Sequence, residues 1–309
     1  MNRRQFLSIA GAFAAWAGSV GETFAFDRAD ASPSIRSLVL VDLDGGNDGL
    51  NTVIPIADPG YRALRPKLAI SKDRALMLDE RTALHPSLLP LMSAWRAGEL
   101  AIVQGVGYDA LNRSHYRSRQ IWDTASHVDE YRTDGWLDRM SLAQTHGVTE
   151  VATFAAASDA VARGASRGVN VIHLTLHGFD THENQGYRHA SRLAQLADGL
   201  ASLRAASMAS GVWDRTLVMT RSEFGRTARE NAAGGTEHGA AAAHFMMGGS
   251  VHGGLFGTPP RLDRLDAGGG LAVGIDFRRL YATVLGACWR IDSASVLGQR
   301  FEPLPVLRV

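Results

Sequence analysis

Short apolar runs along the chain alternate with longer segments whose apolar residues recur every three or four positions. The runs predict β-strands, and the longer segments predict amphipathic helices. Predicted strands cover residues 37–43, 100–106, 170–176, 216–220 and 244–247. Predicted helices cover residues 86–98, 113–124, 189–210 and 277–288. This alternation indicates an α/β fold with a mostly parallel central sheet flanked by helices.

Residues 125–168 mix polar and alanine-rich pieces and show no clear period. We interpret this stretch as a connection with one or two short helices, and no domain boundary is evident in it. Glycines cluster at the ends of the predicted strands, where tight turns and the close approach of a ligand both require them. The pattern therefore predicts a single α/β domain over residues 26–309.

The first 25 residues have the layout of an export signal. Asn2-Arg3-Arg4-Gln5-Phe6-Leu7 is followed by an uncharged run, Ser8 to Val20, and by the small-residue site that ends at Ala25. We interpret residues 1–25 as a twin-arginine signal peptide, which predicts the twin-arginine translocation machinery as a partner and a periplasmic or otherwise exported protein. The alternative is a membrane anchor, but the run is short for a span, so no stable membrane span is expected after cleavage.

Charge and cysteine content exclude other classes. The formal net charge of +1 lacks the basic footprint of a nucleic-acid binder, so no nucleic-acid partner is expected. Cys288 is the only cysteine, which rules out an intramolecular disulfide. It falls on the apolar stripe of the last predicted helix, and we expect a buried side chain rather than a nucleophile.

Unusual polar clusters follow the predicted strands directly. Because the carboxyl ends of parallel strands face one crevice, these clusters are expected to meet in one place. Asp44 and Asp48 lie in the glycine-rich turn after the first strand, where they are either turn residues or ligand-binding carboxylates. Asp180-Thr181-His182 follows the third strand and offers a carboxylate and an imidazole to one cation, or else caps a helix. His177, on the strand itself, is expected to be a core histidine.

The fourth strand runs into Ser222-Glu223-Phe224-Gly225-Arg226. Glu223 is a candidate metal ligand or general base, and Arg226 is a candidate clamp for an oxyanion; alternatively the two form an internal ion pair. Glu237 and His238 lie between glycines, outside any periodic apolar segment, which favours a role in a site over a role in packing.

Ser114 and His115 open the helix after the second strand. Ser114 is either an N-cap or a hydroxyl that acts at the positive end of the helix, with His115 beside it. No Gly-x-Ser-x-Gly elbow surrounds it, which argues against an α/β-hydrolase triad. Together the clusters suit metal-assisted hydrolysis or transfer of a phosphate or sulfate ester, with an anionic small molecule or polymer as substrate.

Six motifs in order resemble the DUF1501 family, whose members commonly carry twin-arginine signals. They are Gly45-Gly46-Asn47-Asp48-Gly49-Leu50-Asn51, Arg113-Ser114-His115-Tyr116, Gly135-Trp136-Leu137-Asp138-Arg139, Gly178-Phe179-Asp180-Thr181-His182, Ser222-Glu223-Phe224-Gly225-Arg226 and Gly235-Thr236-Glu237-His238-Gly239. That family is similar to the alkaline phosphatase-like superfamily, which includes sulfatases. The resemblance implies an alkaline phosphatase-like domain with a two-metal site at the strand ends.

By position, the resemblance implies a divalent metal, zinc or manganese, and a nucleophile at Ser114. The residues it implies as metal ligands are Asp48, Asp180, His182, Glu223, Glu237 and His238. The chain departs from the pattern where Ser222-Glu223 replaces an Asp-His pair, and where Glu237 replaces an aspartate. These departures allow a reduced or absent metal complement.

Three functions remain open from the sequence. An exported metal-dependent hydrolase requires Asp48, Asp180, His182 and His238 to lie within a few ångströms of one another. A non-catalytic exported binding or assembly protein would keep the fold with a degenerate site. A metal-free serine hydrolase requires Ser114 within hydrogen-bond reach of a histidine.

Overall fold

The computed structural model describes residues 35–140, 145–164 and 169–308, which belong to one unit, Pro33–Val309. The predicted signal peptide, residues 1–25, lies outside the described residues. Among the described residues, no helix has both the length and the apolar character needed to cross a membrane.

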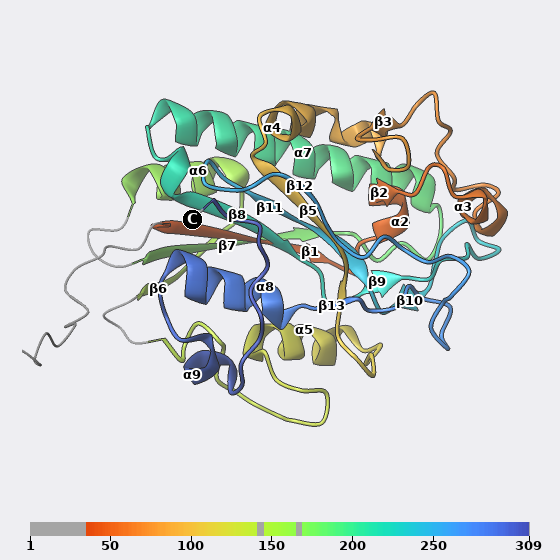
Figure 1. The fold of residues 1–309 in the computed structure, drawn as a ribbon. Helices are drawn as coiled ribbons and strands as arrows, with labels where there is room; N and C mark the ends of the chain where they lie inside the picture. Colours follow the sequence, from red (N-terminus) through yellow and green to blue (C-terminus); the bar gives the residue numbers. More distant parts are fainter. Residues whose placement is uncertain (1–34, 141–144, 165–168, 309) are drawn as a thin grey trace, which may run out of the picture. The chain divides into compact units, whose positions relative to one another are not determined.

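An eight-stranded sheet forms the centre of this unit (Figure 1), in the order β12-β5-β11-β8-β1-β7-β6, with β13 also paired to β5. Its strands are β1 (Ser37–Asp44), β5 (Leu100–Gly107), β6 (Thr145–Val151), β7 (Val169–His177), β8 (Thr216–Arg221), β11 (Ala242–Met247), β12 (Gly254–Gly257) and β13 (Ile275–Asp276). β1 pairs in parallel with both β7 and β8, whereas β11 is antiparallel to β5 and to β8. The prediction of a mostly parallel sheet is confirmed, and the strand predicted at residues 244–247 is its reversed member.

Two small sheets lie apart from the central one. One contains β2 (Val53–Ile54), β4 (Ala83–Leu84) and β3 (Leu76–Met77), and the other contains β9 (Gly225–Arg226) and β10 (His238–Gly239).

Helices cover both faces of the central sheet (Figure 1). On one face lie α4 (Met92–Arg96), α6 (Phe154–Arg163) and α7 (Gln185–Ala209), and on the other α5 (His115–Thr124), α8 (Arg278–Thr283) and α9 (Ser293–Leu297). Shorter segments are α2 (Gly49–Thr52), α3 (Pro59–Leu64), the 3-10 helices η1 (Pro86–Leu91) and η2 (Trp213–Arg215), and the π-helix η3 (Val284–Cys288).

The alternation of side chains along β1 explains the two cores. Leu38 and Leu40 belong to the apolar cluster that contains Ile121 of α5, while Val39 and Val41 belong to the cluster on the opposite face. Successive residues of a strand point to opposite faces, so each helical layer covers its own set of apolar residues. Cys288 is buried in the α5-side cluster, as expected.

Two predicted segments differ from the structure. The helix predicted at residues 86–98 begins as the 3-10 helix η1, because Pro90 lies inside it and cannot donate an α-helical hydrogen bond. Residues 125–168 contain α6 as expected, but also the strand β6, which the sequence did not reveal. Among the strands that the structure describes, β6 is at the edge of the sheet with β7 as its partner, and its apolar pattern is weak.

Candidate metal centre

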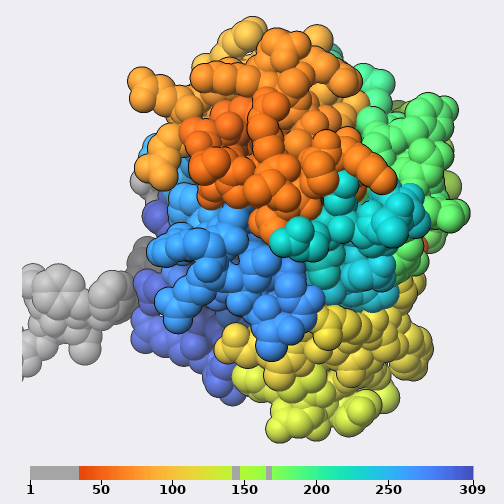
Figure 2. Space-filling view, turned by 90° about the vertical axis from the view of Figure 1, so that its right-hand side faces the viewer, coloured from red at the N-terminus to blue at the C-terminus, as the bar shows by residue number. Residues whose placement is uncertain are grey.

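The strands β9 and β10 lie at one end of the central sheet (Figure 1), and four predicted side chains meet there. They come from different elements: His115 from the first residue of α5, Asp180 and His182 from the loop after β7, and His238 from β10. In Figure 2 the segment around residues 225–240, coloured cyan, adjoins α5, coloured yellow, on this face of the molecule. We call these four residues the His–Asp cluster.

The Nε2 atoms of the three histidines in the His–Asp cluster all lie near the Asp180 carboxylate. Nε2 of His182 lies 2.9 Å from Oδ1, and Nε2 of His238 lies 3.4 Å from the same oxygen. Nε2 of His115 lies 3.5 Å from Oδ2. His115, Asp180 and His238 form a group that could hold a metal ion, because one ligand atom from each lies within 4.8 Å of the others.

The Nδ1 atoms of the same histidines all contact oxygen acceptors. Nδ1 of His115 lies 2.8 Å from Glu223 Oε1, and Nδ1 of His182 lies 2.8 Å from Glu237 Oε2. Nδ1 of His238 lies 3.0 Å from the backbone carbonyl oxygen of Arg113. Each ring can therefore carry a proton on Nδ1 and present the Nε2 lone pair to a metal ion, which is the arrangement of metal-binding histidines.

One short distance depends on where these protons lie. The Nε2 atoms of His182 and His238 are only 3.0 Å apart. If both rings carry their proton on Nδ1, two lone pairs face each other, and a metal ion bound by both would remove that repulsion; otherwise one Nε2 carries a proton and donates to the other. Burial lowers the pKa of His238, which favours the neutral ring at that position.

Asp180 is the ionised partner in this cluster. Burial alone would raise its pKa, but the hydrogen bond and positive charge of Arg226 outweigh burial and lower it. Its side chain is 44% exposed, so the cluster is open to solvent. A carboxylate with several imidazoles is a ligand set that suits zinc, manganese or iron.

Glu223 is not one of the groups around Asp180; it contacts the cluster from the protein interior, through His115. Its side chain is 2% exposed and accepts hydrogen bonds from the Gly45 backbone N–H at 3.0 Å and from His115. Burial raises its pKa. The structure therefore places Glu223 as the carboxylate that orients His115, and Glu237 has the same relation to His182.

Arg226 is a structural clamp, which corrects its expected role at an oxyanion. Its guanidinium is fully buried and donates to the backbone carbonyl oxygens of Gly46, Thr236, Gly45 and Phe179. Its remaining side-chain contact is Asp180 Oδ1, at 2.5 Å. No ion pair links Arg226 to Glu223, because Glu223 points toward His115. Arg226 therefore positions Asp180 and has no donor facing solvent.

Asp48 does not reach the His–Asp cluster, contrary to the expectation from its position. Its carboxylate is 1% exposed, pairs with buried Arg65 at 2.5 Å and caps α2 by accepting from the Leu50 N–H. Burial opposes ionisation, but the charge of Arg65 outweighs it and lowers the pKa of Asp48. The side chain of Gln185 also donates to Asp48. Asp48 is therefore a buried structural carboxylate.

Ser114 is the N-cap of α5. Its hydroxyl accepts from the Arg117 N–H at 3.5 Å, and its own N–H donates to Asn112. No hydrogen bond joins the Ser114 hydroxyl to His115, His182 or His238, all of which are described. The requirement of a metal-free serine hydrolase is thus not met in this conformation, although the hydroxyl is exposed beside His115.

Two glycines explain how the loops approach so closely. Gly45 has φ +121°, and a Cβ there would lie 2.2 Å from the backbone nitrogen of Asp180. A Cβ on Gly235 would lie 2.1 Å from the backbone of His182. Both contacts exclude any larger residue, so the glycine clusters are needed to bring Asp180 and His182 to the site.

Sequence reasoning missed two supporting residues. Arg119 lies one turn after His115 on α5 and contacts Asp44 at 3.1 Å and Glu223 at 3.8 Å. Asn231 donates to Glu237 and to the backbone oxygen of His182. The four-residue spacing from His115 could have revealed Arg119. Nothing local marks Asn231, since a loop asparagine is ordinary turn chemistry.

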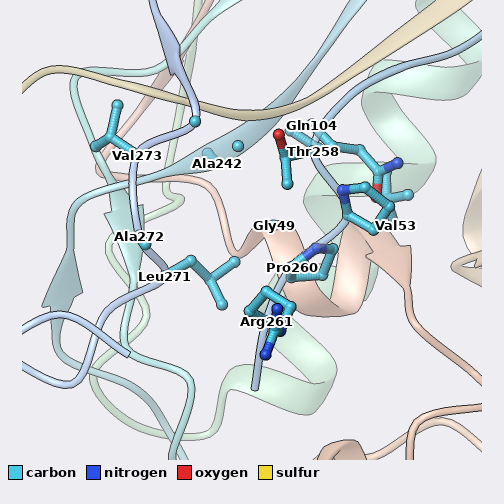
Figure 3. A pocket seen from close by; sticks show the side chains of 14 residues that line it. Gly49, Val53, Gln104, Ala242, Thr258, Pro260, Arg261, Leu271, Ala272 and Val273 are labelled. Atoms are coloured by element: carbon cyan, nitrogen blue, oxygen red, sulfur yellow. The ribbon is translucent and has the colours of Figure 1, made fainter. Parts of the chain in front are cut away.

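A separate cavity lies away from the His–Asp cluster, between α2, β11 and the loop after β12 (Figure 3). Its walls include Val53, Ala242, Pro260, Leu271 and Val273, and Arg261 is its charged residue. It contains none of the predicted site residues, so it adds nothing to the chemistry of the cluster.

A family model described as "Protein of unknown function (DUF1501)" matches residues 129–300, more than half of the chain. The chain belongs to the DUF1501 family. The matched region contains Asp180, His182, Glu223, Arg226, Glu237 and His238. No curated protein matches this DUF1501 chain.

Solved structures similar to this DUF1501 chain share little sequence with it. The C-terminal periplasmic domain of EptC from Escherichia coli, in complex with Zn, is 10% identical with a TM-score of 0.45, covering 72% of this chain and 74% of that one. Ps i-CgsB with k-i-k-neocarrahexaose is 8% identical with a TM-score of 0.40, covering 88% and 73%. The lipoteichoic acid synthase LtaP from Listeria monocytogenes is 9% identical with a TM-score of 0.39, covering 71% and 69%.

Proposed function

We propose that this DUF1501 protein is an exported, metal-dependent hydrolase of a phosphate or sulfate ester with an alkaline phosphatase-like domain. The observation that carries the proposal is the convergence of three Nε2 atoms on one ionised carboxylate, with every Nδ1 held by an oxygen acceptor. Such a set is typical of a transition-metal site with supported ligands. Export through the twin-arginine machinery to the periplasm is part of the proposal and rests on residues 1–25.

His115, Asp180 and His238 would hold the metal, with His182 beside them, and zinc and manganese fit these donors. When bound, the metal would supply a Lewis acid that polarises the ester oxygen. Arg226 keeps Asp180 ionised and aligned, while Glu223 and Glu237 keep His115 and His182 in the tautomer that presents Nε2. Attack would come from the exposed Ser114 hydroxyl at the start of α5 or from a water molecule.

Metal content is the direct test. Protein purified without chelator and analysed for elements should contain one or two equivalents of zinc, manganese or iron, and dialysis against a chelator should remove both metal and ester hydrolysis. Adding zinc or manganese should restore both. A folded protein that carries no metal and takes up neither ion would contradict the proposal and favour a non-catalytic binding or assembly protein with this fold.

Replacing Glu223 should weaken metal binding without removing a ligand. In Glu223→Ala, His115 loses the acceptor at Nδ1, so its ring is free to rotate or to change tautomer. We expect the zinc dissociation constant to rise about 10- to 100-fold, as for other outer-sphere carboxylates. Titration of chelator-stripped protein measures it, with the exposed Glu302→Ala as the matched control. An unchanged dissociation constant would show that Glu223 does not orient His115.

A further inference from the structure

Two polar side chains on the central strands differ in what surrounds them. His177, expected in the core, ends β7 with its side chain 76% exposed, and its Nδ1 contacts Asp44 at 2.7 Å, so a carboxylate and solvent satisfy it. Gln104 of β5 is only 5% exposed. Ile102 and Leu100, two and four residues earlier on the same face of the strand, belong to the apolar core. Gln104 therefore takes a position in which an apolar residue would suit the fold.

The side-chain amide of Gln104 forms no hydrogen bond with any residue that the structure describes. It carries two donor hydrogens and an acceptor oxygen. Gln104 lines two cavities, and Figure 3 shows it with Val53 on one side of the first of them and Leu271 on the other. A buried polar group without a partner costs free energy, so the amide indicates a molecule that enters these cavities and bonds to it.

The first of these, which we call the inner cavity, is small and mostly apolar (Figure 3). It has a volume of about 100 Å³, and its walls include Val53, Leu271 and Val273. Arg261, its charged residue, already binds Asp263 through Nε at 2.8 Å and Nη2 at 2.7 Å. An apolar cavity of about 150 Å³ can bind benzene, so the inner cavity suits a smaller group, such as a branched aliphatic side chain.

The second, which we call the outer cavity, is larger and lies at the edge of the central sheet. Its volume is about 470 Å³, and it adjoins the inner cavity at Gln104 and the exposed Pro259. Leu255 and Gly257 of β12 line it, and β12 is the last strand of the sheet within the described chain. The open side of such a strand presents backbone N–H and C=O groups, to which an extended peptide can bind.

The outer cavity also holds three charged side chains that a ligand could contact. They are Asp58, Asp79 and Arg81. Both carboxylates accept hydrogen bonds from nearby backbone N–H groups, but none of the three side chains forms an ion pair with another described residue. Two negative charges against one positive charge favour a ligand that carries basic groups.

We propose that the two cavities bind an extended peptide. A branched aliphatic side chain fills the inner cavity, and the peptide bond beside it pairs its N–H and C=O with the amide of Gln104. Basic side chains of the peptide lie in the outer cavity near Asp58 and Asp79. A sugar would leave the apolar walls of the inner cavity without a contact, and an anion would meet more carboxylates than free guanidinium groups. This site lies apart from the His–Asp cluster and requires neither the metal nor ester hydrolysis.

Peptide binding is tested by isothermal titration calorimetry with capped pentapeptides of the sequence Lys-Ala-X-Ala-Lys, where X is valine, leucine or isoleucine, at about 1 mM. Binding of at least one of them is expected. The corresponding peptides with aspartate at X, or with glutamate in place of both lysines, should bind at least about tenfold more weakly, because they place a charge in the inner cavity or beside the carboxylates.

Two variants locate the binding. Gln104→Leu removes the amide at a similar volume and should weaken binding about tenfold or more, the effect of losing two hydrogen bonds. Without peptide it should be at least as stable in urea as the wild type, because its neighbours on that face are apolar. Thr258→Trp, at the exposed mouth of the inner cavity, should abolish binding. The exposed Gln299→Leu and Thr133→Trp are the matched controls and should bind as the wild type does.

Each outcome bears on the inference separately from the proposed function. Peptide binding that persists in Asp180→Ala, His182→Ala protein supports a site independent of the metal. No binding of any peptide with an aliphatic X overturns the inference, and so does binding that survives both Gln104→Leu and Thr258→Trp, because the peptide then lies elsewhere. N-methylisobutyramide has the amide and the branched group without the flanking residues. If it binds and no peptide does, the inner cavity is a site for small amides instead.

Discussion

The Asp180→Ala, His182→Ala variant is expected to lose its metal and all ester hydrolysis. Asp180 is the carboxylate on which the three Nε2 atoms converge, and His182 contributes the nitrogen 3.0 Å from His238. Removing both leaves His115 and His238 with no anionic ligand between them. Removing an outer-sphere carboxylate alone lowers metal affinity about 10- to 100-fold, so we expect the removal of two groups that contact the metal to lower the affinity by more than about 100-fold.

Elemental analysis and zinc titration of the double variant measure this effect. Arg226 loses its carboxylate partner in this variant, but the variant should stay folded because Asp180 is 44% exposed, so water can take the place of its carboxylate, and the four backbone carbonyl partners of Arg226 remain. The surface substitutions His252→Ala and Asp263→Ala, combined in one protein, are the matched control for losing one histidine and one aspartate. Wild-type metal content in the Asp180→Ala, His182→Ala protein would place any bound metal outside the His–Asp cluster.

Replacing Asp48 is expected to destabilise the fold while leaving the metal in place. In Asp48→Ala the guanidinium of Arg65, which is fully buried, loses its carboxylate partner. Breaking a buried ion pair from one side costs about 3–5 kcal/mol, because the remaining charge is neither paired nor hydrated. The helix α2 also loses the cap at Leu50. The free energy of unfolding in urea should fall by that amount.

The comparison of single and double variants makes this result specific. Asp48→Leu combined with Arg65→Met removes both charges and should recover much of the lost stability. The pKa of Asp48 is lowered from its ordinary value of 3.8, so its contribution is complete above about pH 4 and is lost as pH falls through the folded-state pKa. Loss of metal from folded Asp48→Ala protein would instead restore Asp48 as a ligand.

Local patterns predicted most of the elements that position the site. The apolar runs of β1, β5, β7 and β8 appear in the sequence with boundaries close to those observed. The direction of β11 could not be predicted, because an apolar run has the same pattern in either orientation and only its neighbours decide. In the described part of the chain β6 pairs with β7 alone, so little of its sequence needs to be apolar.

The sequence placed His115, Asp180, His182 and His238 in one crevice, since each follows a strand whose carboxyl end faces the same edge. It could not show which of the other acidic residues would bind the metal and which would instead accept a hydrogen bond from a histidine. Glu223 and Glu237 are acceptors for Nδ1 atoms, and this depends on ring orientations that packing sets.

By itself, then, the sequence determined the α/β architecture, the family motifs and the edge of the sheet where polar residues gather, because these follow from local periodicity and chain order. Only the tertiary structure decided that Asp48 forms an ion pair with Arg65 and that the guanidinium of Arg226 donates to backbone carbonyl oxygens. The same holds for Asp42, His173 and Arg221, which join β1, β7 and β8 through their side chains. Partner choice among charged side chains depends on distances and burial between separate segments, from 17 residues apart for Asp48 and Arg65 to 179 for Asp42 and Arg221, and no local pattern encodes these.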